Sequence, residues 1–201
     1  MNPDRPTNHV TKRRAWRFWI PLTIQAALIV AVPLQSAVIY NTGTAVTLKT
    51  APVDPYDLLR GYSQTLRYEI SDLETLSKIS GGKEIFEDRL KLRDQKIYVT
   101  LKSPDTPLES ASAWEPVQVS LKRPTDLPDN QVVLAGVYSG WNVKYGLETY
   151  YMPEKQRDRI NKEIRDVQND DEQSFLVDIK VNEKGKSVPV SLWVGDRKYK
   201  F

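Results

Sequence analysis

The sequence predicts an α+β protein, in which a single N-terminal transmembrane helix precedes a mainly antiparallel β domain with one clear amphipathic helix. Residues 18–40 contain no charged side chain, and most of the chain beyond them alternates apolar and polar residues, as half-buried strands do. Helical spacing of apolar residues is clear only over residues 153–169. We therefore expect a basic cytoplasmic tail over residues 1–17, the transmembrane helix over residues 18–40 and an extracytoplasmic, mainly-β domain over residues 41–201.

The uncharged segment has the length that a bilayer requires. As a helix, residues 18–40 would extend about 34 Å, against a hydrocarbon core of about 30 Å. Trp16 and Trp19 lie at one end of the segment and Tyr40 at the other, where interfacial aromatic residues are common. The lipid bilayer is therefore the first partner that we expect.

The charges on the two flanks predict how this helix is oriented. Lys12, Arg13, Arg14 and Arg17 precede it, and no charge follows it until Lys49. By the positive-inside rule the N-terminus is cytoplasmic, and one pass through the plasma (inner) membrane places the remainder outside the cytoplasm. The alternatives are a cleaved signal peptide, whose apolar region is usually only 7–15 residues long, and a helix buried in a soluble protein.

Composition excludes several classes of activity. The chain has no cysteine, and its one histidine, His9, precedes the predicted helix. The β domain therefore lacks the residues for a disulfide, a thiolate site, a Ser-His-Asp triad or a His-ligated metal. Residues 1–17 hold five basic side chains against one acidic one and the whole chain is +3, so residues 18–201 sum to about −1. Because a nucleic-acid binder carries its excess positive charge on the folded domain, we expect no nucleic acid, and we also expect no metal and no cofactor.

Most of the outer domain favours short strands separated by turns. Residues 131–138 form a nearly continuous apolar run, which is typical of a central strand. Residues 183–186 supply a turn between antiparallel strands, residues 56–60 favour one helical turn, and residues 73–93 favour a loop with some helix. The other expected strands are 45–50, 64–70, 97–102, 117–122, 143–151, 174–181, 188–194 and 198–201.

The predicted amphipathic helix has clear start signals. Pro153 suits the first helical position, and Glu154 favours the positive end of the helix dipole. Ile160, Ile164 and Val167 then recur at spacings of four and three residues. These three side chains share one face of a helix whose other faces are charged, so we expect it to lie on a sheet.

Two stretches of the chain resemble one known family. The first is Asp54-Pro55-x-Asp57-Leu58-Leu59-Arg60-Gly61, and the second is Gly146-x-Glu148-x-Tyr150-Tyr151-x-Pro153-Glu154. In these stretches the chain is similar to the GDYXXLXXXY family, which comprises membrane-anchored bacterial proteins without an established activity. The resemblance extends from the anchor to the C-terminus and implies a membrane-tethered protein of the cell envelope.

The signature that names this family is only partly kept. Gly61 and Leu66 match at the expected spacing, but Tyr62 replaces the family's aspartate and Ser63 its first tyrosine. The position of the last tyrosine holds Ile70, and Tyr68 lies two residues earlier. The motif residues with a possible interaction role are Asp54, Pro55, Asp57, Arg60, Gly61, Leu66, Tyr68, Glu148, Tyr150, Tyr151, Pro153 and Glu154.

Charged residues of the first motif suggest a polar site near Gly61. Asp54, Asp57, Arg60 and Glu69 all lie close to this turn in the sequence. A structural role is the alternative that we favour, because aspartate before proline opens turns, Asp57 suits a helix cap, and Arg60 suits a local ion pair with it.

Aromatic residues suggest a recognition surface. Tyr145, Tyr150 and Tyr151, with Trp141, would suit a sugar or a peptide. Aromatic residues are also common in strands, where alternation buries about half of them. We therefore favour packing over ligand binding for these four.

Two hydrolytic arrangements need no histidine. Glu148 and Glu154 would have to flank a glycosidic bond, and Ser63 or Ser71 would have to meet a neutral lysine. Nothing in the sequence places the two carboxylates face to face, and no Ser-Met-x-Pro segment follows the anchor. We assign no catalytic residue.

The function that we expect is therefore a non-enzymatic binding or scaffold module in the cell envelope, whose partner is another membrane or envelope protein. The alternative is a membrane-tethered hydrolase that uses carboxylates or a Ser/Lys dyad. A third hypothesis is an anchor that carries an assembly subunit with no pocket.

Overall fold

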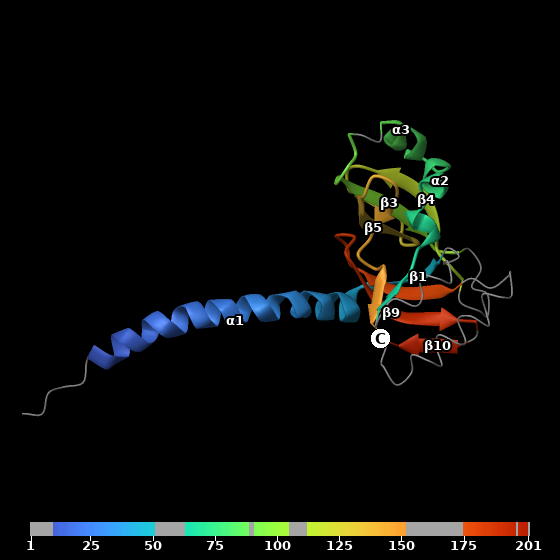
Figure 1. Cartoon of the computed structure of the whole chain (residues 1–201). Helices are drawn as coiled ribbons and strands as arrows, with labels where there is room; N and C mark the ends of the chain where they lie inside the picture. The colour runs from blue at the N-terminus through green and yellow to red at the C-terminus, as the bar shows by residue number, and fades with distance from the viewer. Residues whose placement is uncertain are drawn as a thin grey trace, which may run out of the picture. The chain divides into compact units, whose positions relative to one another are not determined.

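A computed structural model describes residues 10–50, 63–88, 91–104, 112–151, 175–195 and 197–200. It divides the chain into two compact units, Met1–Val38 and Ile39–Phe201. The first unit holds most of the helix α1, Val10–Thr42, and the second holds all ten strands of the part described (Figure 1). The predicted α+β class, an N-terminal apolar helix followed by antiparallel sheets, is confirmed.

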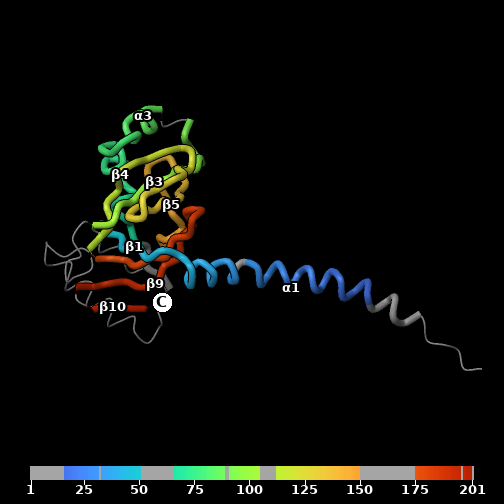
Figure 2. Tube along the Cα trace, turned by 180° about the vertical axis from the view of Figure 1, so that it is seen from behind, coloured from blue at the N-terminus to red at the C-terminus, as the bar shows by residue number. Residues whose placement is uncertain are grey.

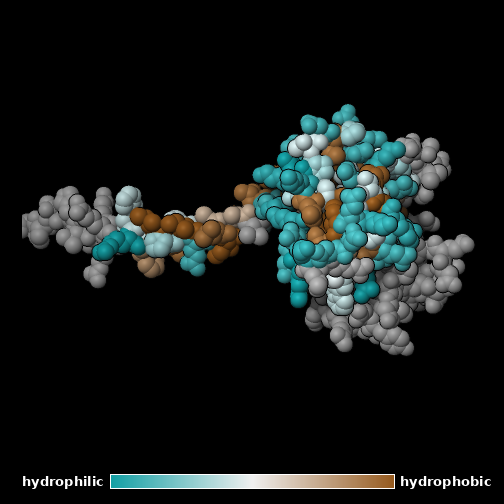
Figure 3. Space-filling view, turned by 90° about the horizontal axis from the view of Figure 1, so that it is seen from above, coloured by the Kyte–Doolittle hydropathy of each residue, from teal (hydrophilic) through white to brown (hydrophobic). Residues whose placement is uncertain are grey.

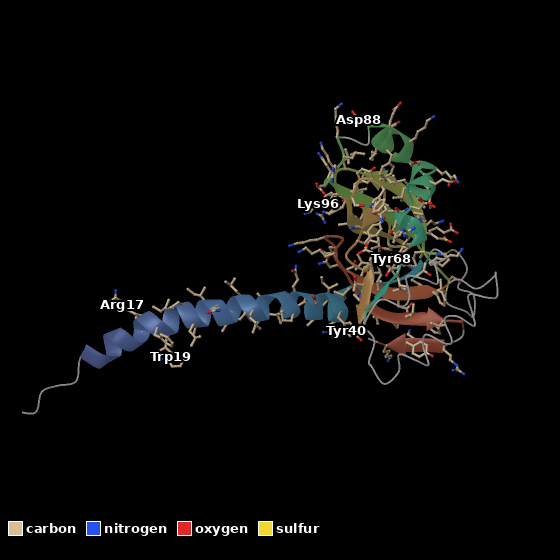
Figure 4. All side chains as sticks on the ribbon, viewed as in Figure 1. Arg17, Trp19, Tyr40, Tyr68, Asp88 and Lys96 are labelled. Carbon is tan, nitrogen blue, oxygen red and sulfur yellow. The ribbon has the colours of Figure 1, made fainter. Side chains whose placement is uncertain are left out.

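Helix α1 includes the whole predicted apolar segment. The stretch Trp16–Thr42 is long and apolar enough to cross a membrane, and few of its side chains are buried. Apolar side chains make up much of its visible surface in Figure 3, whereas the visible face of the β-rich unit is mostly hydrophilic. Figure 4 shows Arg17 and Trp19 near one end of α1 and Tyr40 near the other.

Two four-stranded antiparallel sheets form the body of the second unit. The first has the order β1-β8-β9-β10, from Thr44–Lys49, Leu176–Val181, Ser187–Val194 and Arg197–Lys200. The second has the order β4-β3-β5-β6, from Glu115–Ser120, Lys96–Lys102, Gln131–Tyr138 and Val143–Lys144. Figures 1 and 2 show the two sheets at separate ends of the unit, and α2 (Leu73–Ser77) and α3 (Gly82–Glu87) lie beside β4.

Alternation along the strands builds one core between these sheets. Val46 and Leu48 of β1 are buried, and they pair with the buried Ile179 and Val177 of β8. The intervening residues face the other side of the sheet, because successive side chains of a strand alternate between its faces. The apolar run of residues 131–138 forms β5, which lies between β3 and β6, so its prediction as an interior strand is confirmed.

Two predicted strands are wrong in extent. Of residues 64–70, only Ser63–Thr65 form a strand, β2, and a 3-10 turn, η2, follows over Glu69–Ser71. Residues 143–151 divide into β6 and β7 (Thr149–Tyr151), because Gly146 adopts a φ of +76° between them. Such a left-handed backbone turns the chain out of its strand. The helix expected over residues 153–169 and the helical turn at residues 56–60 lie outside the described residues.

Candidate functional site

Two segments that are distant in sequence lie side by side in the structure: residues 63–70, which follow the first motif stretch, and residues 145–151, which include the start of the second. β2 pairs antiparallel with β7, with Ser63 opposite Tyr151 and Thr65 opposite Thr149. The pairing continues beyond the strands, because the backbone N–H of Leu66 donates to the carbonyl oxygen of Glu148 at 2.7 Å. The described parts of these two segments therefore form a single two-stranded element.

Two buried tyrosines join these segments reciprocally. The hydroxyl of Tyr68, in the first segment, donates to the carbonyl oxygen of Leu147 at 2.8 Å, and that of Tyr145, in the second, donates to the carbonyl oxygen of Ile70 at 2.6 Å. Tyr68 is only 1% exposed and lies in the interior of the β-rich unit (Figure 4). Because each hydroxyl satisfies a carbonyl of the other segment, we call Tyr68 and Tyr145 the tyrosine pair.

The environment of Tyr145 keeps its hydroxyl protonated. Burial, and to a smaller extent the negative charge of Glu148, raise its pKa well above the ordinary value. A phenol in this state donates a hydrogen bond but does not act as a base near neutral pH. The geometry therefore assigns Tyr145 to the core, and of the predicted aromatic surface only Trp141, 76% exposed, faces outward among the side chains described.

Glu148 is occupied by a local turn. Its Oε1 accepts a hydrogen bond from the backbone N–H of Tyr145 at 2.6 Å, across the left-handed turn at Gly146. This arrangement satisfies a backbone donor that the turn would otherwise leave open. The second carboxylate of the glycosidase hypothesis, Glu154, lies outside the described residues, so the pairing of the two carboxylates stays a hypothesis.

The remaining predicted residues divide into two groups. Glu69 forms an ion pair with Lys49 at 2.7 Å, and the buried hydroxyl of Ser71 has no hydrogen-bond partner within the described residues. Among the described residues, Ser71 therefore has no lysine beside it, as a Ser/Lys dyad would need. The backbones of Tyr150 and Tyr151 lie in β7. The others lie outside the described residues: Asp54, Pro55, Asp57, Arg60, Gly61, Pro153 and Glu154.

A polar network that the sequence analysis did not identify crosses the other face of the first sheet. One carboxylate oxygen of Asp178 (β8) accepts from Thr47 at 2.9 Å, and the other accepts from Ser191 at 2.8 Å. That second oxygen also accepts from the indole N–H of Trp193 and from the Lys198 ammonium, both at 2.8 Å. The Asp178 network therefore includes a side chain from each of the four strands.

The network holds Asp178 in its charged form. Burial by itself raises the pKa of Asp178, but hydrogen bonds from Lys198, Trp193, Ser191 and Thr47 together lower it below the ordinary value. Lys198 also lies over the Trp193 ring, 4.7 Å from its centroid. Since both carboxylate oxygens are engaged, the network ties the strands together and leaves no reactive group. One sequence signal pointed to it, an aspartate in the middle of an apolar strand, where aspartate is rare.

A family model matches residues 25–192, which include the second half of α1 and the chain from β1 to β9. This chain belongs to the GDYXXLXY family. No curated protein matches the chain. No solved structure matches it either. The family's name describes a sequence signature rather than an activity, so membership assigns none.

The name of the GDYXXLXY family corrects the signature used in the sequence analysis. Aligned on Gly61 and Leu66, the shorter signature places its last tyrosine at Tyr68 rather than at Ile70. Leu66 and Tyr68 are both buried, and Tyr68 is one half of the tyrosine pair. In this GDYXXLXY protein, the last two named positions of the signature, Leu66 and Tyr68, therefore stabilise the fold.

No metal centre is visible in the described ranges. No group of three or more His, Cys, Asp or Glu side chains in them is placed to hold a metal ion. The polar groups of the tyrosine pair, of Glu148 and of the Asp178 network form hydrogen bonds or ion pairs with other groups of the chain.

Proposed function

We propose that this GDYXXLXY protein is a membrane-tethered module that binds or scaffolds another membrane or envelope protein without catalysing a reaction. In this proposal, Trp16–Thr42 crosses the plasma (inner) membrane once. The N-terminus is cytoplasmic, because the basic side chains precede the helix, and the β-rich unit lies outside the cytoplasm. The hydropathy and the outward-facing side chains of α1 support the membrane tether.

One observation supports binding over catalysis more than any other. In the residues described, the tyrosine and glutamate groups that first suggested binding or catalysis serve the chain's own fold: the hydroxyls of the tyrosine pair bond to backbone carbonyls, and the Glu148 carboxylate closes a turn. A hydrolase instead holds its acid, base or nucleophile toward a substrate site.

The loop between β5 and β6 offers the partner a contact. Trp141 is 76% exposed there. The loop itself is held in place, because the hydroxyl of Tyr138 donates to the carbonyl oxygen of Gly140 at 2.5 Å and that of Ser139 to the carbonyl oxygen of Asn142 at 3.0 Å. A large aromatic side chain on an ordered loop is typical of an interface anchor. We therefore place the protein contact at Trp141.

Site-specific photo-crosslinking in intact membranes tests this function. A photoreactive phenylalanine is placed at position 141 and, as the matched control, at the exposed Glu74 of α2. We expect one protein to be crosslinked from position 141 and not from position 74. Crosslinks to lipid alone, or the same products from both positions, would contradict the proposal.

A further inference from the structure

The membrane-spanning candidate joins the first sheet without a linker. α1 ends at Thr42 and β1 begins at Thr44, so that only Gly43 separates them. The N–H of Gly43 donates to the carbonyl oxygen of Ile39 at 2.8 Å, and a Cβ atom on Gly43 would lie 2.6 Å from that oxygen. It would also lie 3.0 Å from the carbonyl oxygen of Val181, which pairs with Thr44. Since Ile39 belongs to the same compact unit as the strands, the C-terminal end of β8 is fixed beside the last turn of α1.

The chain continues from Val181 directly into a rigid turn, residues 182–186, which joins β8 to β9. The side chain of Asn182 accepts from the backbone N–H groups of Lys184 and Lys186 at 3.0 and 2.9 Å. Gly185, with a φ of +79°, accepts from the N–H of Ala135 in β5 at 2.9 Å. The turn is therefore held both by its own bonds and by the neighbouring sheet.

Positive charge gathers on this turn. Lys184 and Lys186 are exposed, and neither has an ion pair within the part of the chain that the structure describes. The exposed Arg123 reaches the turn and donates to the carbonyl oxygen of Glu183 at 2.7 Å. Glu183 is the only acidic residue of the turn. This excess of cations contrasts with the sum of about −1 over residues 18–201.

We propose that Arg123, Lys184 and Lys186 form a basic surface that binds the phosphate groups of anionic phospholipids in the bilayer that holds α1. The inference rests on the proposed membrane tether. If α1 crosses the bilayer as far as Thr42, the end of β8 and the turn that follows it lie next to the headgroups. Lysine and arginine there meet phosphates of opposite charge and orient the β-rich unit against the membrane.

The absence of native cysteine allows a single-label test in the full chain. Glu183→Cys carries a nitroxide on the turn, and Glu74→Cys carries one on α2 as the control position. The labelled chain is reconstituted into vesicles of phosphatidylcholine alone or of phosphatidylcholine mixed with phosphatidylglycerol. Accessibility of each nitroxide to a water-soluble nickel chelate is then measured. We expect the anionic lipid to protect the label at position 183 and to leave that at position 74 unchanged.

Removing the positive charges of the turn tests how strongly the basic surface binds anionic lipid. Each lysine near an anionic surface contributes about fivefold to the binding equilibrium, so Lys184→Gln with Lys186→Gln should weaken docking about 25-fold and abolish the protection. The matched control is Lys83→Gln with Lys91→Gln, which removes the same charge from the exposed α3 region and should change nothing. Equal accessibility in both lipids, or protection that survives the double substitution, would overturn the inference.

The same preparation separates this inference from the membrane tether. A chain that fails to remain with vesicles of either composition contradicts the tether itself. A chain that remains with both vesicles but shows no lipid-dependent protection contradicts only the basic surface.

Discussion

Removing one hydroxyl of the tyrosine pair should destabilise the β-rich unit by a measurable and limited amount. In Tyr68→Phe the ring still fills its buried site, but the carbonyl oxygen of Leu147 loses its donor. A lost hydrogen bond costs about 1 kcal/mol and an unsatisfied buried partner raises that figure, so we expect a loss of about 1–2 kcal/mol in the free energy of unfolding. Tyr145→Phe should cost about the same, because it deprives the carbonyl of Ile70.

Thermal unfolding of the full chain in detergent, followed by circular dichroism, measures these losses. For a protein of this size, 1 kcal/mol corresponds to about 2–4 °C in Tm, so each variant should melt about 2–8 °C below the wild type. Tyr98→Phe is the matched control, because Tyr98 is half-buried on β3 and its hydroxyl has no hydrogen bond to any residue that the structure describes. If Tyr68→Phe and Tyr145→Phe have the same Tm as the wild type and Tyr98→Phe, the tyrosine pair does not stabilise the fold.

Three further predictions concern other parts of the second unit. Asp178→Asn should cost about 2 kcal/mol at pH 7, because the aspartate accepts charge-assisted bonds with its side chain only 19% exposed. Folding lowers the pKa of Asp178, so the carboxylate's contribution to stability is complete above the unfolded-state pKa of about 3.9 and is lost as the pH falls through the folded-state pKa. Urea unfolding should therefore show a smaller difference in the free energy of unfolding between the wild type and Asp178→Asn at pH 3 than at pH 7. Gly185→Ala should lower Tm more than Gly146→Ala. The two glycines have similar φ values, +79° and +76°, but only at position 185 would the new Cβ meet a neighbour, the backbone nitrogen of Ala135 at 2.9 Å. Equal decreases in Tm would contradict this prediction. Lys49→Gln should change the free energy of unfolding by less than about 0.5 kcal/mol in the same urea titration, because its ion pair with Glu69 is about 40% exposed on each side, and a larger loss would mean that this pair is structural.

Local patterns in the sequence predicted most of the strands. Alternation over residues 97–102 found β3, because successive side chains of a strand point to opposite faces of the sheet, and the apolar run of residues 131–138 found β5, which lies inside its sheet. The same reasoning failed over residues 143–151. There the alternation continues through Gly146, but the left-handed backbone of this glycine divides the stretch into two strands of different sheets.

Long-range register could not be predicted from these patterns. The Asp178 network depends on Thr47 and Ser191 lying opposite Asp178 in neighbouring strands, and no local signal shows which residues of separate strands pair. The tyrosine pair depends in the same way on the alignment of two segments about 80 residues apart. Sequence reasoning did foresee that Tyr145 would pack rather than bind a ligand, but it had no means of finding its partner, the carbonyl of Ile70.

In the proposed function, α1 lies in lipid and the β-rich unit lies outside the cytoplasm. Spheroplasts that express a C-terminally tagged chain are incubated with or without external protease, and their membranes are then extracted with alkaline carbonate. This experiment tests both the membrane tether and the side of the membrane on which the β-rich unit lies. We expect the uncut chain to stay in the carbonate-washed membrane and external protease to remove the tag. An uncut chain released as a soluble species, or a tag protected until the spheroplasts are lysed, would contradict the proposal.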